Sequence, residues 1–356
     1  MNLLRSAGAF LVMSFLLIGC GSNNGTTTNN GVVTTIAGTA GVVGSTDATG
    51  PAARFSHPYG ITKLNGNLYI TDRYNNTIRK IAATGAVTTI AGSAGTQGSS
   101  DGTGAAASFY NPFGITNDGT NLYVTDTYNN TIRKIVPATG AVTTIAGTAG
   151  TAGSSDGTGA AATFSAPHGI VTDGTNLYVA DIDNHTIRKI VIATGAVTTI
   201  AGTAGAGGSS DGTGAAARFY FPIAITTDGT NLYVAEMLNH TIRRIVISTG
   251  AVTTVAGTAG TSGSTDGIGP AARFFAPQGI TVSGTTLYVS DTGNHTIRTI
   301  DTATGTVKTL AGSAGTSGST DSTGPAARFF SPIGIIIDGS TLYVSDNDNC
   351  TIRMIQ

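Results

Sequence analysis

Short runs of apolar residues separated by polar turns recur along the chain. In the third of these units, apolar or alternating runs occupy residues 169–171, 177–180, 186–191 and 197–200. Turn-forming residues lie between the runs, for example the tetrapeptide Asp-Gly-Thr-Asn. No stretch keeps a helical period over a useful length, and four short strands joined by tight turns form one antiparallel meander.

This meander repeats six times at an almost constant spacing. The tripeptide Thr-Ile-Arg recurs once in each unit, ending at Arg79, Arg133, Arg188, Arg243, Arg298 and Arg353. The first interval is one residue shorter than the later ones, which are all equal. A period of this length, with four strands in each unit, is typical of a propeller in which each unit forms one blade. We therefore predict an all-β fold: a six-bladed β-propeller of four-stranded antiparallel blades.

The two ends of the chain indicate how the ring closes. The first copy of the fourth strand, Val33–Gly38, precedes any first strand, whereas the last unit ends at Gln356 on its third strand. We therefore expect the N-terminal strand to pair with residues 351–355 and to complete the last blade. This pairing would hide two strand edges that are otherwise open to other chains.

The repeated unit resembles the NHL repeat, whose pattern has four motifs in a fixed order. The third unit carries all four, as Pro167–Ile170, Leu177–Asp181, Asn184–Arg188 and Val197–Gly202. The resemblance covers all six units from about residue 33 onward, and the period is too long for a WD40 repeat. It implies a propeller fold, in agreement with the strand pattern.

Composition and charge narrow the possible partners. The 356 residues include 51 Gly and no Trp, only 10% are charged, and the formal net charge is −1. Nucleic-acid binding requires clustered Lys and Arg that displace counterions, so no nucleic-acid partner is expected. The few charges recur singly at fixed positions of the repeats, which indicates structural pairing.

The N-terminal residues have the features of a targeting segment. An apolar run at residues 7–18 is too short to span a bilayer, and Leu17-Ile18-Gly19-Cys20 looks like the lipobox of bacterial lipoproteins. We expect cleavage before Cys20 and acylation of its sulfur, with a plain secretory signal as the alternative. The resemblance implies export and a lipid anchor in the cell envelope, in the outer membrane if the cell is diderm.

These features divide the chain into three parts. Residues 1–19 form the lipoprotein signal peptide, residues 20–32 the lipidated Cys and a flexible tether, and residues 33–356 the propeller. With Cys20 acylated, Cys350 is the one remaining thiol, so no disulfide within the chain is expected. Cys350 stands where other units carry Asn or His, and we interpret it as a tolerated substitution. The protein is expected to be a monomer.

One face of the ring is predicted to carry the recognition surface. Alternating strand direction places the long loops between blades and the turns between second and third strands on the same face. Three positions there vary although the rest of each repeat does not. The first is the residue after the blade-opening Pro: Tyr59, Phe113, His168, Ile223, Gln278 and Ile333. The second is the residue before that Pro, which includes His57, Asn111 and Phe221. The third comprises the two residues after the acid that ends strand two, which include Arg73, Tyr74 and Tyr128. Relaxed drift at exposed positions is the alternative interpretation.

The long loops contain a recurrent Asp-x-x-Gly-(Pro/Ala)-Ala-Ala-x-Phe. We expect a single helical turn there, because Pro suits a first helical position. Its Phe is expected to plug the crevice between blades. The Asp, for example Asp47, is expected to cap the helical turn rather than to bind calcium, which needs several oxygen ligands.

The repeated charges are interpreted as structural rather than catalytic. An acid that ends strand two and the Arg of strand three should form one ion pair in every blade, since catalysis rarely repeats with six-fold symmetry. The pairs are Asp72/Arg79, Asp126/Arg133, Asp181/Arg188, Glu236/Arg243, Asp291/Arg298 and Asp346/Arg353. The histidines at 185, 240 and 295 lie on different blades, too far apart to share a zinc ion.

No catalytic constellation, metal site or cofactor is predicted. We therefore expect a non-catalytic propeller that binds a protein, peptide or glycan at the cell envelope. The alternative is a propeller hydrolase or lyase with a metal in the central channel, similar to lactonases or amidating lyases. Against it, the first strands supply mainly Ile, Thr and Val to the channel, with Lys63 and Asn117 as exceptions.

Overall fold

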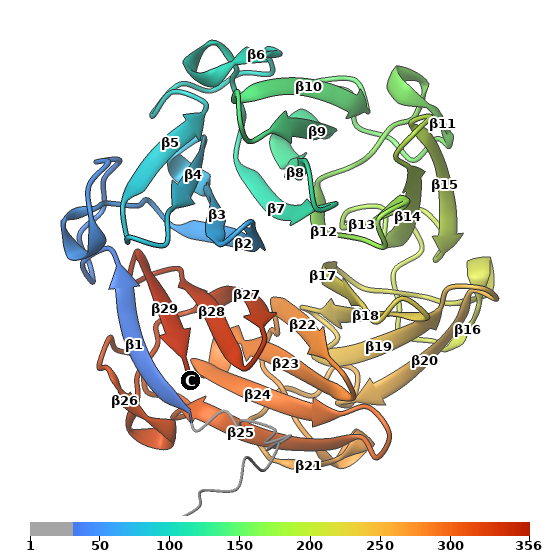
Figure 1. Ribbon diagram of the computed structural model, residues 1–356. Helices are drawn as coiled ribbons and strands as arrows, with labels where there is room; N and C mark the ends of the chain where they lie inside the picture. The colour runs from blue at the N-terminus through green and yellow to red at the C-terminus, as the bar shows by residue number, and fades with distance from the viewer. Residues whose placement is uncertain (1–30) are drawn as a thin grey trace, which may run out of the picture.

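The structure, a computed structural model, describes residues 31–356 and is a ring of six antiparallel sheets around a central channel (Figure 1). The predicted signal peptide, Cys20 and most of the tether lie outside the described residues. Among residues 31–356, no helix is long and apolar enough to cross a membrane.

The first strand of each blade lines the channel, and the second and third strands follow outward. The first strands are β2 (Pro58–Leu64), β7 (Pro112–Asn117), β12 (Pro167–Thr172), β17 (Pro222–Thr227), β22 (Gly279–Ser283) and β27 (Pro332–Asp338). The second are β3 (Asn67–Asp72), β8 (Leu122–Asp126), β13 (Asn176–Asp181), β18 (Asn231–Glu236), β23 (Thr286–Asp291) and β28 (Thr341–Asp346). The third are β4 (Thr77–Ile81), β9 (Thr131–Val136), β14 (Thr186–Val191), β19 (Thr241–Val246), β24 (Thr296–Asp301) and β29 (Thr351–Ile355).

The fourth strands form the outer part of each blade, and the N-terminal strand is one of them. They are β5 (Val87–Ala91), β10 (Ala141–Ala146), β15 (Ala196–Ala201), β20 (Ala251–Ala256), β25 (Thr306–Gly312) and β1 (Val32–Ala37). Strand β1 pairs antiparallel with β29, with Val33 opposite Ile355 and Thr35 opposite Arg353. The predicted closure of the ring by its N-terminal strand is therefore present.

Five blades carry a fifth, two-residue strand that the sequence did not predict. These strands are β6 (Gly102–Thr103), β11 (Gly157–Thr158), β16 (Gly212–Thr213), β21 (Gly267–Ile268) and β26 (Ser322–Thr323). Each belongs to the loop that enters the blade and pairs with the start of that blade's fourth strand, as Gly102 does with Val142. In the first blade the same contact is a single bridge between Thr49 and Ala86.

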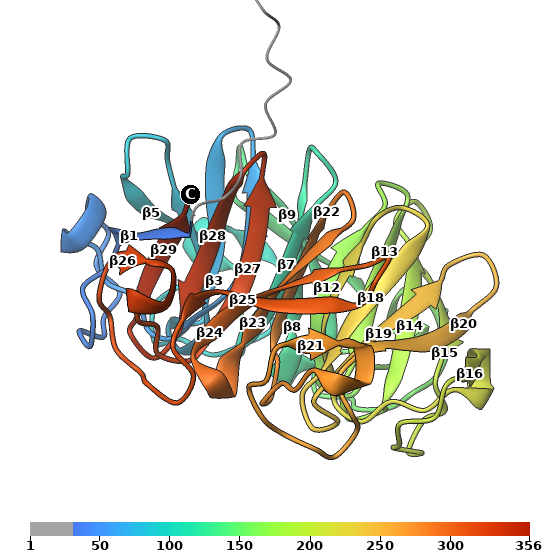
Figure 2. The same cartoon turned by 90° about the horizontal axis from the view of Figure 1, so that it is seen from below.

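The long loops also contain the predicted helical turn, as a 3-10 helix of three residues. These turns are η1 (Gly50–Ala52), η3 (Gly104–Ala106), η5 (Gly159–Ala161), η6 (Gly214–Ala216), η7 (Gly269–Ala271) and η9 (Gly324–Ala326). Three more, η2 (Arg73–Asn75), η4 (Thr127–Asn129) and η8 (Thr292–Asn294), lie between second and third strands. Figure 2 shows the ring from the side.

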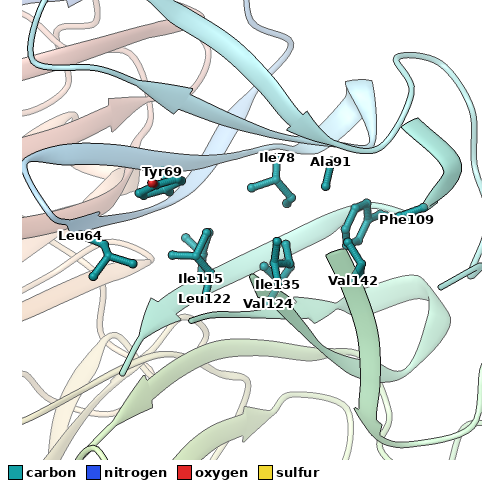
Figure 3. Packing of buried hydrophobic residues seen from close by; sticks show 11 residues of the cluster. Leu64, Tyr69, Ile78, Ala91, Phe109, Ile115, Leu122, Val124, Ile135 and Val142 are labelled. Carbon is teal, nitrogen blue, oxygen red and sulfur yellow. The ribbon is translucent and has the colours of Figure 1, made fainter. Parts of the chain in front are cut away.

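The apolar core lies between neighbouring blades rather than at one centre. Figure 3 shows the layer between the first two blades, where Phe109 packs against Ile78 and Ala91 of one blade and Ile115 and Val142 of the next. The Phe is completely buried, as are its counterparts in the other loops. Each loop therefore plugs the crevice between two blades, as expected, and stabilises the ring by burying apolar area.

A buried ion network holds each blade to its loop. Arg79 is fully buried and donates to Asp72, also fully buried, at 2.6 Å and to the half-exposed Asp47 at 2.7 Å. Its guanidinium also lies 5.1 Å from the centroid of the Phe55 ring. The same arrangement recurs at Arg133, Arg188, Arg243, Arg298 and Arg353.

The loop Asp does not cap the 3-10 turn, so that expectation is wrong. No side chain caps η1. Instead, Asp47 accepts hydrogen bonds from the backbone N–H and the hydroxyl of Thr89, at 2.9 and 3.1 Å. A carboxylate between a buried guanidinium and an edge-strand N–H satisfies both donors. The loop Asp thus links the third strand, the fourth strand and the loop of one blade.

Candidate functional site

The six residues that follow a blade-opening Pro converge on the ring axis. Tyr59, Phe113, His168, Ile223, Gln278 and Ile333 all line one depression of about 520 Å³. The depression opens on the face of the long loops, because the turns between second and third strands contact those loops, as where Asn75 Nδ2 donates to Gly44 O at 2.7 Å. The structure therefore brings this predicted set together.

Local backbone geometry directs these side chains to the axis. The residue before each Pro has a positive φ, between 49° and 56° in all six blades, for example 56° at His57. A β-bulge follows, since Pro58 pairs with Asp72 but Ile61 pairs with Ile70. Bulges redirect side chains in this way. Close by, a Cβ on Gly60 would lie 2.3 Å from Phe113 O, so a side chain there would separate the two blades.

The converging side chains form a packed floor rather than an exposed ring. The centroids of Tyr59 and Phe113 are 4.5 Å apart and those of Phe113 and His168 are 4.0 Å apart. The Tyr59 hydroxyl donates to Gln278 Oε1 at 3.3 Å. Tyr59, Phe113, His168, Ile223 and Ile333 are buried, and Gln278 is half-buried. Most of this set therefore contributes to the stability of the ring as well as to the shape of the depression.

Burial of the floor changes the pKa values of its polar groups. Burial lowers the pKa of His168 to about 4, and the positive charge of Arg73 lowers it further, against a hydrogen bond with Ala166 O at 3.0 Å. Burial raises the pKa of the Tyr59 hydroxyl. His168 is therefore neutral at pH 7, and the floor carries no charge.

The wall of the depression carries the charged groups. Arg73 lies on the first blade, Asp183 on the third and Asp348 on the sixth, and all three line the depression. Asp348 lies 3.8 Å from His57 Nε2. Arg73 packs its guanidinium against two rings, 4.2 Å from the centroid of Phe113 and 4.6 Å from that of Tyr74. The three charges belong to different blades, so they break the six-fold symmetry of the ring.

Not every predicted residue faces the depression. Phe221 and Tyr128 line it, whereas His57, Asn111 and Tyr74 do not. Asn111 is buried, and its backbone N–H donates to Asn76 Oδ1 of the preceding blade at 2.9 Å. His57 and Tyr74 stack on each other with 4.6 Å between centroids. These three residues support or border the site.

Some of the variable positions link neighbouring blades. The hydroxyls of Thr127 and Thr292, at the position of Arg73, donate to the next blade's Pro carbonyl at 2.6 and 2.7 Å. Asn347 makes the equivalent bond to Pro58 O at 3.1 Å. Arg73 makes no such bond among the described residues, and Ile182 and Met237 carry no donor. Half of this variable set is therefore structural.

The long loops on this face also present three exposed aromatic side chains that sequence reasoning missed. Tyr220, Phe275 and Phe330 directly follow the loop Phe of their repeats and are 39%, 46% and 40% exposed. With Tyr74 and Tyr128, each 48% exposed, they form what we call the aromatic rim. The available signal was variation at this position, which is Ser, Tyr, Ser, Tyr, Phe and Phe in successive units.

Below the floor the channel continues as a second cavity of about 220 Å³. Tyr59, Ile223, Gln278 and Ile333 line both cavities, so they separate the depression from the channel. Ile and Thr side chains, such as Ile61 and Thr116, supply most of the channel wall. Within residues 31–356, no three His, Cys, Asp or Glu side chains are grouped closely enough to hold a metal ion.

The repeated histidines have a local role. His185, His240 and His295 occupy the left-handed turn before strand three, with φ between 58° and 60°, where other units have Asn or Cys350. His240 Nδ1 accepts the backbone N–H of Ala276, and His295 Nδ1 that of Ser331, both at 3.2 Å. These two side chains therefore connect one blade to the next, as Asn76 does.

Comparisons with known proteins agree with the fold. No family model matches the chain. It is 29% identical over 293 residues to human NHL repeat-containing protein 2, covering 72% of this chain and 40% of that protein. It is also 29% identical over 326 residues to the Arabidopsis thaliana chloroplastic protein SUPPRESSOR OF QUENCHING 1, covering 86% and 31%. The chain thus spans less than half the length of these relatives.

Solved structures with a similar fold include a binding protein and a lyase. An auxiliary nutrient binding protein from Bacteroides thetaiotaomicron has a TM-score of 0.69 at 18% identity, covering 91% of this chain and 76% of that one. Virginiamycin B lyase from Staphylococcus aureus has a TM-score of 0.53 at 18% identity, covering 85% and 95%. At such identity these likenesses bear on the fold alone.

Proposed function

We propose that this chain, an NHL-repeat six-bladed β-propeller, is a non-catalytic binding protein of the cell envelope that recognises a protein, peptide or glycan through the depression on the long-loop face. The observation that carries this proposal is the convergence of the varied positions on one depression in an otherwise repetitive scaffold. A rigid ring that holds variable loop residues around a concavity is a common design for binding sites.

The aromatic rim supports the same assignment. Five exposed aromatic rings on one face offer apolar area to a ligand while the blades below stay packed. The auxiliary nutrient binding protein with a similar fold is an example of this architecture in a binding protein. The expected lipid anchor at Cys20 would hold the propeller at a membrane through the tether of residues 20–32.

A pull-down from envelope extract tests the proposal. The full chain in detergent micelles is the bait, beside a Tyr128→Ala/Tyr220→Ala/Phe221→Ala variant that removes aromatic rings from the depression and its rim. We expect the variant to lose the captured ligand while it keeps its melting temperature. Thr120→Lys, an exposed substitution on a turn between first and second strands, is the control and should capture normally. Equal capture by all three proteins would contradict a binding role for this face.

A propeller lyase is the second candidate, because virginiamycin B lyase has a similar fold over 85% of this chain. It is separated from the binding role by two measurements on the purified full chain. Metal analysis would detect a bound ion, and chromatography after incubation with virginiamycin B would reveal its conversion by a change in retention. We expect virginiamycin B to remain intact, and its turnover would overturn the non-catalytic assignment.

A further inference from the structure

Arg73 differs from every residue at its position in the other blades. The equivalent residues Thr127, Thr292 and Asn347 each donate to the next blade, and Ile182 and Met237 are apolar. Arg73 is half-buried, and its guanidinium has no acid within ion-pair distance among the described residues. A guanidinium carries five N–H donors and a permanent charge, so one that lines a concavity without a carboxylate partner is available to a ligand.

The guanidinium is also held in place. It lies against the faces of Phe113 and Tyr74, 4.2 and 4.6 Å from their centroids, so the two rings restrict its plane without using its N–H donors. Arg73 lines the depression, and its charge lowers the pKa of His168 in the floor. A positive charge fixed beside a buried, uncharged floor attracts a negatively charged group of a ligand to the part of the depression next to Arg73.

The other charges of the depression indicate which anion fits. Asp183 and Asp348 line the same depression, so its three charged groups carry a net negative charge. A doubly charged phosphate would be repelled by the two acids more strongly than a singly charged carboxylate. A carboxylate also matches the planar guanidinium with two parallel hydrogen bonds. The two Asp carboxylates remain as acceptors for hydroxyl groups of the same ligand.

We propose that Arg73 is the carboxylate-binding residue of this depression and that the ligand is an acidic saccharide. This inference rests on the proposed binding function and specifies its ligand class. A uronic acid combines the three features that the site complements: one carboxylate for Arg73, hydroxyl donors for the two acids, and sugar faces that stack on exposed aromatic rings such as Tyr128 and Tyr220.

Calorimetric titration of the full chain in detergent micelles tests the proposal. The probes are trigalacturonate and its methyl ester, a hyaluronan tetrasaccharide and its carboxyl-reduced form, and tetraglutamate as an acidic peptide. We expect at least one acidic saccharide to bind about tenfold more tightly than its esterified or carboxyl-reduced counterpart. Arg73→Gln should abolish that preference, and Arg73→Lys should restore only part of it, since an ammonium supplies the charge without the planar pair of donors.

Arg244→Gln is the matched control, because it removes a guanidinium from the third strand of another blade, outside the depression. Equal affinity of wild type and Arg73→Gln for the acidic saccharides would overturn the role of Arg73 and leave the proposed function intact. Arg73-dependent binding of tetraglutamate in place of the saccharides would overturn the ligand class. If no saccharide binds although the envelope pull-down succeeds, the saccharide assignment is wrong; if the pull-down fails as well, the binding function fails with it.

Discussion

The ring of Tyr59 stands nearly edge-on to the ring of Phe113 at the axis of the propeller, with an angle of 69° between their planes. The two residues come from adjacent blades, and both are buried. Edge-to-face pairs of this kind add to the free energy gained from apolar burial. The floor of the depression therefore helps to hold the blades together.

Replacing the floor should cost stability, whereas replacing the rim should not. Phe113→Ala is expected to lower the free energy of unfolding by about 3 kcal/mol, because it leaves a cavity between blades. Tyr128→Ala, at a 48% exposed position, should change it by about 0.5 kcal/mol or less. Denaturant unfolding measures both, and equal midpoints for the two variants would show that the floor is not part of the core.

Closure of the ring by β1 is testable with two adjacent valines. Val33 is 1% exposed and faces the last blade's core, whereas Val32 is 42% exposed. Val33→Asp should reduce the free energy of unfolding by about 3 kcal/mol or more, since a buried carboxylate without a partner is costly. Val32→Asp is the matched control and should melt like the wild type. A similar melting temperature for Val33→Asp would contradict the pairing of β1 with β29.

The buried ion network predicts unequal effects of its two acids. Asp72→Asn should destabilise the protein by about 3 to 5 kcal/mol, because the fully buried Arg79 loses its buried counter-charge. Asp47→Asn should cost about 1 kcal/mol or less, because Asp47 is 45% exposed and solvent screens its ion pair. Thermal unfolding of both variants measures the two effects. A larger loss of stability for Asp47→Asn than for Asp72→Asn would contradict our assignment of Asp72 as the main partner of Arg79.

His168 should make stability depend on pH. The pKa of His168 in the folded protein is lowered to about 4, below the ordinary value of 6.5. Between pH 4 and pH 6.5, His168 is therefore protonated in the unfolded chain but neutral in the folded protein. The contribution of neutral His168 to the free energy of unfolding is fully present above pH 6.5. It is lost as the pH falls toward 4, and the total loss is about 3 kcal/mol.

The variant His168→Gln isolates this effect, because Gln278 occupies the same position in the fifth blade. Buried acids such as Asp72, whose pKa burial raises to about 6, titrate in the same range but are shared by both proteins. The difference in unfolding free energy between wild type and variant should therefore change between pH 7 and pH 4. A constant difference would show that His168 does not stay neutral.

The expected lipid anchor is tested in the cell. Wild type should fractionate with membranes and incorporate a palmitate analogue, whereas Cys20→Ala should do neither, because the acylated sulfur is gone. Cys350→Ala is the control and should label like the wild type. Labelling of the Cys20→Ala variant would show that the anchor lies elsewhere.

The sequence by itself was sufficient for the architecture. A nearly constant repeat length, four strand patterns per unit and an unpaired fourth strand at Val33–Gly38 lead directly to six blades closed by β1, because each of these features depends on local pattern and on counting. It was also sufficient to locate the varied positions on one face, because strand direction alternates.

Only the tertiary structure decided what those positions do. Tyr59 and Phe113 belong to successive repeats, and nothing in their local sequences shows that six strands approach closely enough at the axis to bury them. The pairing of Asp47 with Arg79 and the fifth strands depend likewise on where a long loop returns to its blade. Burial is set by neighbours in space, and for these residues the neighbours come from other blades or other segments of the chain.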